Sequence, residues 1–419
     1  MNFIISFLST PAVLLGLVAC IGLLAQKKSG IQVLTGTFKT VIGFLMFSSG
    51  GSIITASLQN FNALFQEGFN LTGVIASPEA ATALAQNEYA LVTSMTLITG
   101  FIMNLVFARI TPFKNIFFTT GHSLFFACVL ALILKANGMN DLWSIIIGGL
   151  ILGFMSAFLP AICQPFMRKI TGSDETAIGH FNMIGYALAG YIGKLFSKYE
   201  SESTENIKFP GWLSFFRDFN MGLSAVMIVI FYLATFAAGP SFTQEMAGTQ
   251  HWLVYPLIQA FTFVAGMTIL LSGVRMFLGE ITAAFSAISD KYIPNSRPAL
   301  DVPTIFPFAP TAVLVGFISS YSAGLIAVAV MVVLNFPIVI IPAAHICFFS
   351  GGTAAVFGNS TGGWRGAVAG SFVTGLLLAF LPLVLYPLYG SLGIAGSTFP
   401  NIDYNVIGIL LNWIIGLFA

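Results

Sequence analysis

Residues 142–163 read LWSIIIGGLILGFMSAFLPAIC, a run that contains no charged side chain. Its length matches the roughly 20 apolar residues that a helix needs to cross the hydrocarbon core of a bilayer. The run lacks the residue-by-residue alternation of barrel strands, and a helix satisfies its own backbone hydrogen bonds inside lipid. This stretch therefore predicts a transmembrane helix and indicates the class of the whole chain.

The overall composition agrees with a membrane location. Of 419 residues, 57% are hydrophobic and 7% are charged, and the mean hydropathy is +0.92. Soluble domains carry roughly 25% charged residues, so this chain needs lipid as its main solvent. We predict an all-α integral membrane protein with about 10–11 transmembrane helices plus re-entrant hairpins. The net charge of +1 leaves no basic stripe for phosphates, so no nucleic-acid partner is expected.

Apolar runs separated by polar turns give the order of the expected segments. The predicted spans are residues 3–25, 31–58, 89–107, 116–134, 142–163, 221–238, 252–271, 311–333, 367–388 and 404–418. The second span should be interrupted by the small residues at 48–52, and the stretch at 60–87 is read as a polar loop. The first span should be retained, because the first lysines follow its apolar run. Residues 177–192 and 336–364 are broken apolar segments, and residues 273–293 form an amphipathic stretch.

The positions of lysine and arginine predict the orientation in the membrane. Cytoplasmic loops carry an excess of these residues, whereas the stretch at 60–87 contains neither. That stretch is therefore expected outside and the long mixed-charge loop at 194–218 inside. The residues assigned to the cytoplasmic side are Lys27, Lys28, Arg109, Lys114, Arg168, Lys169, Lys194, Lys198 and Arg275.

Two halves of the chain repeat one order of segments. The first, residues 1–205, has a helix pair at 1–58 and core segments at 89–193. The second, residues 206–388, has a helix pair at 219–293 and core segments at 297–388, and residues 389–419 form a C-terminal helix. Gly- or Pro-interrupted segments at matching positions of two halves point to a binding site. The alternative is that Gly and Pro are simply commoner in membrane helices.

Three ionisable residues lie in the breaks of apolar segments: His122, His180 and Asp301. Such a residue costs about 2.5–3.5 kcal/mol on insertion scales, so it needs a partner or a water-filled cavity. A neutral imidazole both donates and accepts, and a carboxylate can accept a proton from a hydroxyl that is being phosphorylated. We predict that the three contact a small polar solute; a packing role is the alternative for either histidine. The other predicted contacts are Thr120, Gly121, Gly179, Asn182 and Asn359.

Other ionisable residues favour different roles. His251 precedes Trp252 at a span end and is expected to anchor the interface, while His345 is undecided. Arg275 and Glu280 lie on the amphipathic stretch, which should lie on the membrane or against a partner. The four cysteines stand singly, and no GxxxxGK[ST] phosphate loop occurs. The chain is therefore expected to have no metal, cofactor or catalytic residue of its own.

A set of short motifs occurs in a fixed order along the chain: TTGH at 119–122, AIGH at 177–180, FPGWL at 209–213, MAG at 246–248 with His251 and Trp252, GVRMF at 273–277 with Glu280, Asp301, FAP at 308–310 and GGWR at 362–365. This set resembles the IIC membrane component of the ascorbate-type permeases of the phosphoenolpyruvate-dependent phosphotransferase system. The resemblance extends over nearly the whole chain.

This resemblance implies a homodimeric, multi-pass carrier of the bacterial inner membrane, surrounded by lipid. It implies two inverted repeats and an elevator-type movement of a core domain that carries the solute inward. A separate cytoplasmic IIB protein would then pass phosphate from its cysteine to the solute. By the family's pattern, Ser49, Gly50 and Gly51 would line the same cavity as His122, His180 and Asp301.

The sequence departs from the family where ascorbate carriers have solute-binding glutamines after each Gly-His pair. Here those places hold Phe125, Phe126 and Ala127, and Phe181, Asn182 and Met183. The lost amides leave L-ascorbate and related sugars or polyols open as solutes, because aromatic rings can stack on a ring-shaped molecule. Two other mechanisms also remain: an ion-coupled secondary transporter that uses Asp301 or Glu280 as its ion site, and a passive channel.

Overall fold

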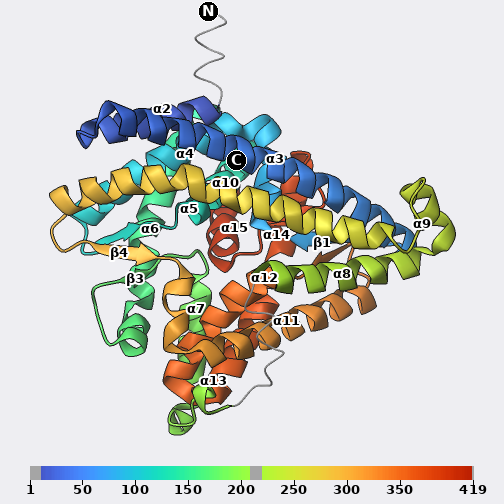
Figure 1. The fold of residues 1–419 in the computed structure, drawn as a ribbon. Coiled ribbons are helices and arrows are strands. Elements are labelled where there is room, and N and C mark those ends of the chain that lie inside the picture. The colour runs from blue at the N-terminus through green and yellow to red at the C-terminus, as the bar shows by residue number, and fades with distance from the viewer. Residues whose placement is uncertain (1–10, 208–218, 418–419) are drawn as a thin grey trace, which may run out of the picture.

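The computed structural model describes residues 11–207 and 219–417, and helices dominate it (Figure 1). The helices are α2 (Pro11–Ala25), α3 (Gly30–Phe69), α4 (Pro78–Ile110), α5 (Thr120–Ala136), α6 (Asp141–Thr171), α7 (Met183–Lys194), α8 (Phe219–Ala238), α9 (Pro240–Ala247), α10 (Tyr255–Tyr292), α11 (Pro310–Val333), α12 (Ala344–Ile346), α13 (Gly352–Phe380), α14 (Pro382–Ser391) and α15 (Ile402–Gly416). Short 3-10 turns cover Ser197–Tyr199, Thr204–Asn206, Val302–Thr304 and Phe306–Phe308, and a π-helical turn covers Cys347–Gly351.

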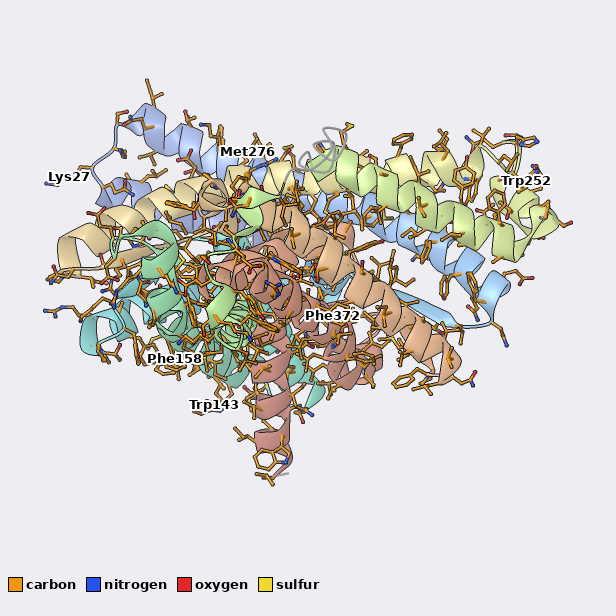
Figure 2. The ribbon with its side chains drawn as sticks, turned by 90° about the horizontal axis from the view of Figure 1, so that it is seen from below. Lys27, Trp143, Phe158, Trp252, Met276 and Phe372 are labelled. Atoms are coloured by element: carbon orange, nitrogen blue, oxygen red, sulfur yellow. The ribbon has the colours of Figure 1, made fainter. Side chains whose placement is uncertain are left out.

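Within the described ranges, seven helical stretches are long and apolar enough to cross a membrane, which confirms an all-helical, multi-pass membrane protein. They are Gly30–Phe69, Glu88–Ile110, Asp141–Thr171, Asn220–Ala238, Tyr255–Gly273, Pro310–Val333 and Ala344–Ser391; Thr120–Ala136 and Ile402–Gly416 are shorter apolar helices. Lys27 and Trp252 lie at opposite ends of the layer of long helices in Figure 2. The larger total of 10–11 spans stays a prediction, and residues 3–10 of the first predicted span and the FPGWL motif lie outside the described ranges.

Three predicted boundaries are wrong. The helix α3 continues through the small residues at 48–52 because these residues allow close helix packing: a Cβ on Gly50 would lie 2.7 Å from the carbonyl oxygen of Gly266 on α10. The stretch at 60–87 is mostly the end of α3, a strand and the first turns of α4, which Ser77 caps by accepting the amide hydrogen of Ala80. The span at 252–271 and the amphipathic stretch at 273–293 form one helix, α10.

In the part of the chain that the structure describes, six short strands occupy the breaks between helices. They are β1 (Thr72–Ala76), β2 (Asn115–Phe117), β3 (Ala177–Ile178), β4 (Arg297–Leu300), β5 (Ile338–Ile341) and β6 (Ser397–Thr398). They form two parallel three-stranded sheets with the orders β5-β1-β6 and β2-β4-β3. Figure 1 shows β3 and β4 on one side of α15 and β1 on the other.

Every one of these strands leads into a helix or a 3-10 turn within a few residues. Because the strands of each sheet are parallel, their carboxyl ends share one edge, and three chain turns meet there. The folding pattern therefore collects residues that are far apart in sequence at two sheet edges.

The predicted break at 359–363 is confirmed as a kink inside α13. Gly362 and Gly363 leave the helical conformation, and Gly363 has φ +60° and ψ −155°, a region open to glycine alone. The chain between α7 and α8 packs into this kink: the amide of Trp364 donates to the carbonyl oxygen of Glu202 at 2.8 Å. A Cβ at residue 363 would meet the carbonyl oxygens of Tyr199 and Glu202.

Candidate solute-binding site

The carboxyl edge of the β2-β4-β3 sheet brings His122, His180 and Asp301 together. His122 lies in the first turn of α5 after β2, His180 follows β3, and Asp301 follows β4 directly. Asn104 helps to hold β2 in place, since it donates to the carbonyl oxygen of Asn115 and accepts the amide hydrogen of Phe117. Three breaks separated by long helices thus place their polar residues at one point.

The contacts among these three side chains assign their hydrogen-bonding roles. His180 Nδ1 lies 3.1 Å from Asp301 Oδ1, so it donates to the carboxylate and leaves Nε2 as an acceptor. The hydroxyl of Tyr404 donates to the carbonyl oxygen of His122 at 2.9 Å and lies 3.2 Å from His122 Nδ1, whose proton it can accept. The two imidazole rings have centroids 3.8 Å apart. The Asp301 side chain is 47% exposed, and that of His180 only 5%.

A second imidazole–carboxylate pair lies at the carboxyl edge of the β5-β1-β6 sheet. Glu79 follows β1 and His345 follows β5, and Glu79 Oε2 lies 3.3 Å from His345 Nε2. Ser77 donates its hydroxyl to the same Glu79 oxygen at 2.8 Å. Both members of this pair are buried.

The two sheet edges face one cavity of about 590 Å³, a size usual for small-molecule sites. Helices α8 and α10 supply another part of its wall through Asn220, Thr268, Leu271, Arg275 and Gly279. The rest of the lining comprises Glu79, Phe118, Thr119, Thr120, Gly121, His122, Phe125, His180, Leu300, Asp301, Pro303, His345, Ile346, Phe349 and Ser350. Polar groups from five breaks and apolar rings together suit a small polar molecule with an apolar face.

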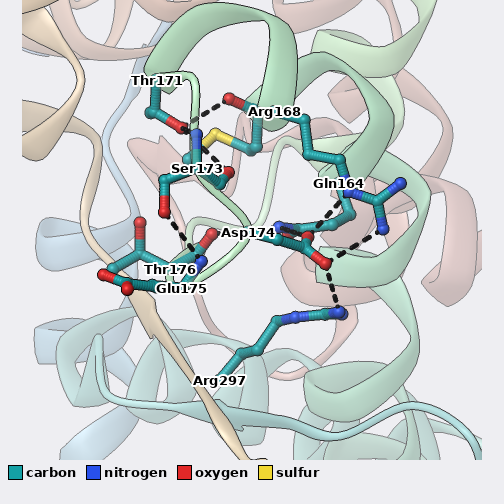
Figure 3. Close-up of polar contacts among 9 residues, drawn as sticks. Gln164, Arg168, Thr171, Ser173, Asp174, Glu175, Thr176 and Arg297 are labelled. Atoms are coloured by element: carbon teal, nitrogen blue, oxygen red, sulfur yellow. Dashed lines mark hydrogen bonds and ion pairs between the residues drawn. The ribbon is translucent and has the colours of Figure 1, made fainter.

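An ion cluster at the opposite end of β4 holds the strand that carries Asp301 (Figure 3). Arg297 Nη2 donates to Asp174 Oδ2 at 2.7 Å, while Arg168 Nε and Gln164 Nε2 reach Asp174 Oδ1 at 2.8 and 2.7 Å. The hydrogen bonds from Arg168 and Gln164, with the positive charge of Arg297, lower the pKa of Asp174 to about 2. This cluster joins α6, the turn before β3 and the start of β4.

Five predicted contact residues line the cavity: His122, His180, Asp301, Thr120 and Gly121. Gly179 does not line it and instead lets β3 approach β4. Its amide donates to the carbonyl oxygen of Leu300 at 2.7 Å, and a Cβ there would lie 2.6 Å from the carbonyl oxygen of Ala299. Gly179 therefore positions His180 and does not touch the cavity itself.

The structure does not bring the other five predicted residues to the cavity. Ser49 is exposed on α3, and Gly50 and Gly51 pack closely against α10 and α4. Asn182 is buried at the start of α7, where it donates to the Ser350 hydroxyl at 2.7 Å and accepts the Ile402 amide hydrogen at 2.6 Å. Asn359 caps a neighbouring turn through the amide of Thr204.

Seven polar residues of the described lining were not among the predicted contacts: Glu79, Thr119, His345, Ser350, Asn220, Thr268 and Arg275. Glu79 carried a usable signal, because the Ser-Pro-Glu order at 77–79 is a helix-start pattern directly after a short apolar run. His345 likewise follows Pro342 at the end of an apolar run. Arg275 was assigned to a membrane or partner face, but it lines the cavity.

The aromatic residues that stand where the family has glutamines divide into two groups. Phe125 lines the cavity, so its ring can contact a solute. Phe126 and Phe181 are buried and pack with Tyr404 at ring-centroid distances of 5.2 and 5.6 Å. These two rings support Tyr404, which in turn fixes His122.

The same trio also has the donor set of a metal site. One ligand atom from each of His122, His180 and Asp301 lies within 4.8 Å of the others. Two imidazoles and a carboxylate bind divalent transition metals, so these are the residues that would hold such an ion. The expectation that no metal is needed stays a prediction.

Comparison with known proteins identifies the family of the chain. The family model for the PTS system sugar-specific permease component (EIIC-GAT) matches residues 6–403. The chain is 26% identical over 426 aligned positions to the ascorbate-specific PTS system EIIC component of Mycoplasma pneumoniae (strain ATCC 29342 / M129 / Subtype 1). That alignment covers 89% of this chain and 64% of the relative, so the chain spans less than two thirds of the relative's length. The chain belongs to the sugar-specific permease (EIIC) family of the phosphotransferase system.

Proposed function

We propose that this chain carries a small polar solute into the cytoplasm, where a separate IIB protein phosphorylates it. The observation that supports this most directly is the cavity itself, with the half-exposed carboxylate of Asp301 hydrogen-bonded to His180. A family membership that implies transport with phosphorylation supports the same conclusion.

The proposed chemistry needs only one proton acceptor from this chain. A solute hydroxyl oxygen attacks the phosphorus of the IIB phosphocysteine, a P–O bond forms, and the P–S bond breaks. The hydroxyl proton passes to Asp301, and the IIB thiolate leaves. His180 donates to Asp301 and so orients the carboxylate, which is a usual arrangement for a general base. The phosphoryl donor is the partner, so this chain acts as its carrier.

L-ascorbate or a related sugar or polyol is the solute class that we propose. The Nε2 atoms of His122 and His180 and the carboxylates provide acceptors for hydroxyl groups, and Phe125 and Phe349 provide apolar faces. The ascorbate specificity in the name of the Mycoplasma relative favours L-ascorbate as the first compound to test.

We also propose two inverted repeats and an elevator-type movement. The strand orders support the repeats: exchanging β1 with β4, β2 with β5 and β3 with β6 converts the order β5-β1-β6 into β2-β4-β3. The long helices α3 and α10 precede the two central strands. This correspondence favours a second repeat that continues beyond residue 388 through β6 and α15, leaving no separate C-terminal helix.

A homodimer in the bacterial inner membrane completes the proposal. Large apolar side chains such as Ile31, Leu34 and Phe38 are exposed along α3 and need lipid or a second copy to cover them. We propose that lipid and the second protomer share these surfaces.

The test is uptake of labelled L-ascorbate into vesicles with and without phosphoenolpyruvate and the relay proteins. We expect phosphorylated product inside only with the complete relay. Asp301→Asn should reduce that product by about 100-fold or more, since general bases contribute roughly 10²–10⁴-fold. Accumulation of unmodified solute, driven by a gradient alone, would falsify group translocation.

An ion-coupled transporter is the second candidate. The buried Glu79–His345 pair supports it, because a carboxylate inside a cavity can carry a proton. Glu280 is less suited, since it pairs with Lys39 at 3.6 Å and does not line the cavity. Uptake that an ionophore abolishes, and that does not respond to phosphoenolpyruvate, would favour this candidate.

A further inference from the structure

Among the described residues, Arg275 is the only lysine or arginine that lines the cavity. Both lining carboxylates already have imidazole partners, Glu79 with His345 and Asp301 with His180. Among the described residues, no carboxylate lies within ion-pair distance of the Arg275 guanidinium. A fixed positive charge therefore faces the cavity without an anionic protein partner in the described ranges.

The residues beside Arg275 add hydrogen-bond donors to the same wall. The hydroxyl of Thr268, about two helical turns earlier on α10, is shared between the carbonyl oxygen of Val264 at 2.8 Å and Asn220 Oδ1 at 3.0 Å. Since its oxygen is engaged, Asn220 offers its amide N–H groups to other acceptors. The α8–α10 wall thus supplies donors, whereas the sheet edges supply the carboxylates Asp301 and Glu79.

We propose that Arg275 binds the phosphoryl group of the solute as that group is transferred. This inference rests on the proposed function. A phosphorylated solute in this cavity lies beside two carboxylates, which repel it, and Arg275 is the only permanent positive charge among the described lining residues. A guanidinium offers paired N–H donors that match two phosphoryl oxygens, and it stabilises the charge in phosphoryl transfer.

Arg275 would stabilise the negative charge of the phosphoryl group, whereas Asp301 would accept the proton of the solute hydroxyl. Experiments can therefore distinguish the two roles. A solute that is itself anionic offers the same oxygen chemistry to the guanidinium. The test therefore uses three probes: L-ascorbate, which is anionic at neutral pH, the neutral polyol sorbitol, and inorganic phosphate.

The variants are Arg275→Gln and Arg275→Lys, with Arg109→Gln as the matched control. Arg109 is an exposed arginine at the end of α4 and does not line the cavity. Arg275→Gln should lower the rate of product formation with the complete relay by about 10- to 150-fold, as expected for charge-assisted hydrogen bonds. It should also abolish the rise in melting temperature caused by inorganic phosphate, and leave the melting temperature without ligand within a few degrees of the wild type.

Arg275→Lys should retain part of both effects, and Arg109→Gln should match the wild type. Product formation within twofold of the wild type in Arg275→Gln would overturn the inference. Loss of L-ascorbate binding with unchanged phosphate and sorbitol responses would also overturn it, and would assign Arg275 to the solute's own anionic group. If the wild-type protein itself forms no phosphorylated product, the proposed function fails; a phosphate response that Arg275→Gln abolishes would still support an anion site.

Discussion

Asp301 and Glu79 follow the central strands of the two sheets, yet their surroundings differ. The Asp301 side chain is 47% exposed, whereas that of Glu79 is 9% exposed and receives hydrogen bonds from both Ser77 and His345. A solute hydroxyl can reach Asp301 more easily, because that carboxylate keeps open hydrogen-bonding positions. We infer that Asp301 accepts the proton of the solute hydroxyl and that Glu79 mainly orients His345.

The two histidines near Asp301 should contribute to affinity. His122→Ala and His180→Ala each remove one hydrogen-bonding partner of the solute, worth about 0.5–1.5 kcal/mol, so each should raise the dissociation constant about 2- to 13-fold. Equilibrium binding of labelled L-ascorbate to purified protein measures this. His251→Ala is the control, because His251 lies outside the lining. If neither variant changes the affinity for L-ascorbate, the two histidines pack within the protein and do not bind the solute.

At the scale of elements, the register of the β2-β4-β3 sheet determines where the site residues lie, because His122, His180 and Asp301 come shortly after the ends of β2, β3 and β4. The Asp174 cluster serves this purpose from the amino end of β4. The pKa of Asp174 is held at about 2, below the usual value of about 3.9, so the cluster stabilises the fold above about pH 4. That contribution declines as the pH falls from about 4 toward 2, when the carboxylate becomes protonated.

Asp174→Asn should therefore lower the melting temperature at pH 7 and weaken solute binding without changing any lining residue. The difference in melting temperature from the wild type should narrow as the pH is lowered from about 4 toward 2. Glu175→Gln, one residue away in the same turn, serves as the control. A difference that stays constant with pH would show that the carboxylate charge of Asp174 does not stabilise this element.

The kink in α13 makes a second prediction at this scale. Gly363→Ala forces a Cβ into a glycine-only conformation and against two carbonyl oxygens, so it should destabilise the protein by about 1–3 kcal/mol. Thermal unfolding in detergent measures the effect. Gly390→Ala on α14 has open space around it and should be neutral or slightly stabilising, because alanine favours helices.

Sequence reasoning found the helices and part of the site for identifiable reasons. His122, His180 and Asp301 stood out because they interrupt apolar runs, and the kink at Gly362 and Gly363 carried a Gly-Gly signal. The strands have two to five residues, too few to leave a periodic pattern, so their pairing was not predictable. Without that pairing, Glu79 and His345 could not be brought to the same cavity, and the glycines of α3 resembled a break.

At the scale of the whole molecule, the cavity lies between elements from both parts of the chain. A solute that contacts α5, α10 and both sheet edges links them, so binding should stabilise the entire fold. At a concentration 100-fold above the dissociation constant, a ligand adds about 2.7 kcal/mol. We expect L-ascorbate, in a screen with sugars and polyols, to raise the melting temperature of the wild type and to raise that of His180→Ala less at equal concentration.

The exchange of strands between the two parts of the chain also determines the order of assembly during synthesis. Thr72 pairs with Ile338, and Ile75 pairs with Ser397, so the sheet partners that the described residues give β1 are made more than 260 residues after it. Its backbone groups must be sheltered in the meantime, by lipid headgroups, the insertion machinery or water. The β2-β4-β3 sheet can form once residues 297–300 have been made, but the β5-β1-β6 sheet, and with it the complete cavity, must wait for residues 338–341 and 397–398.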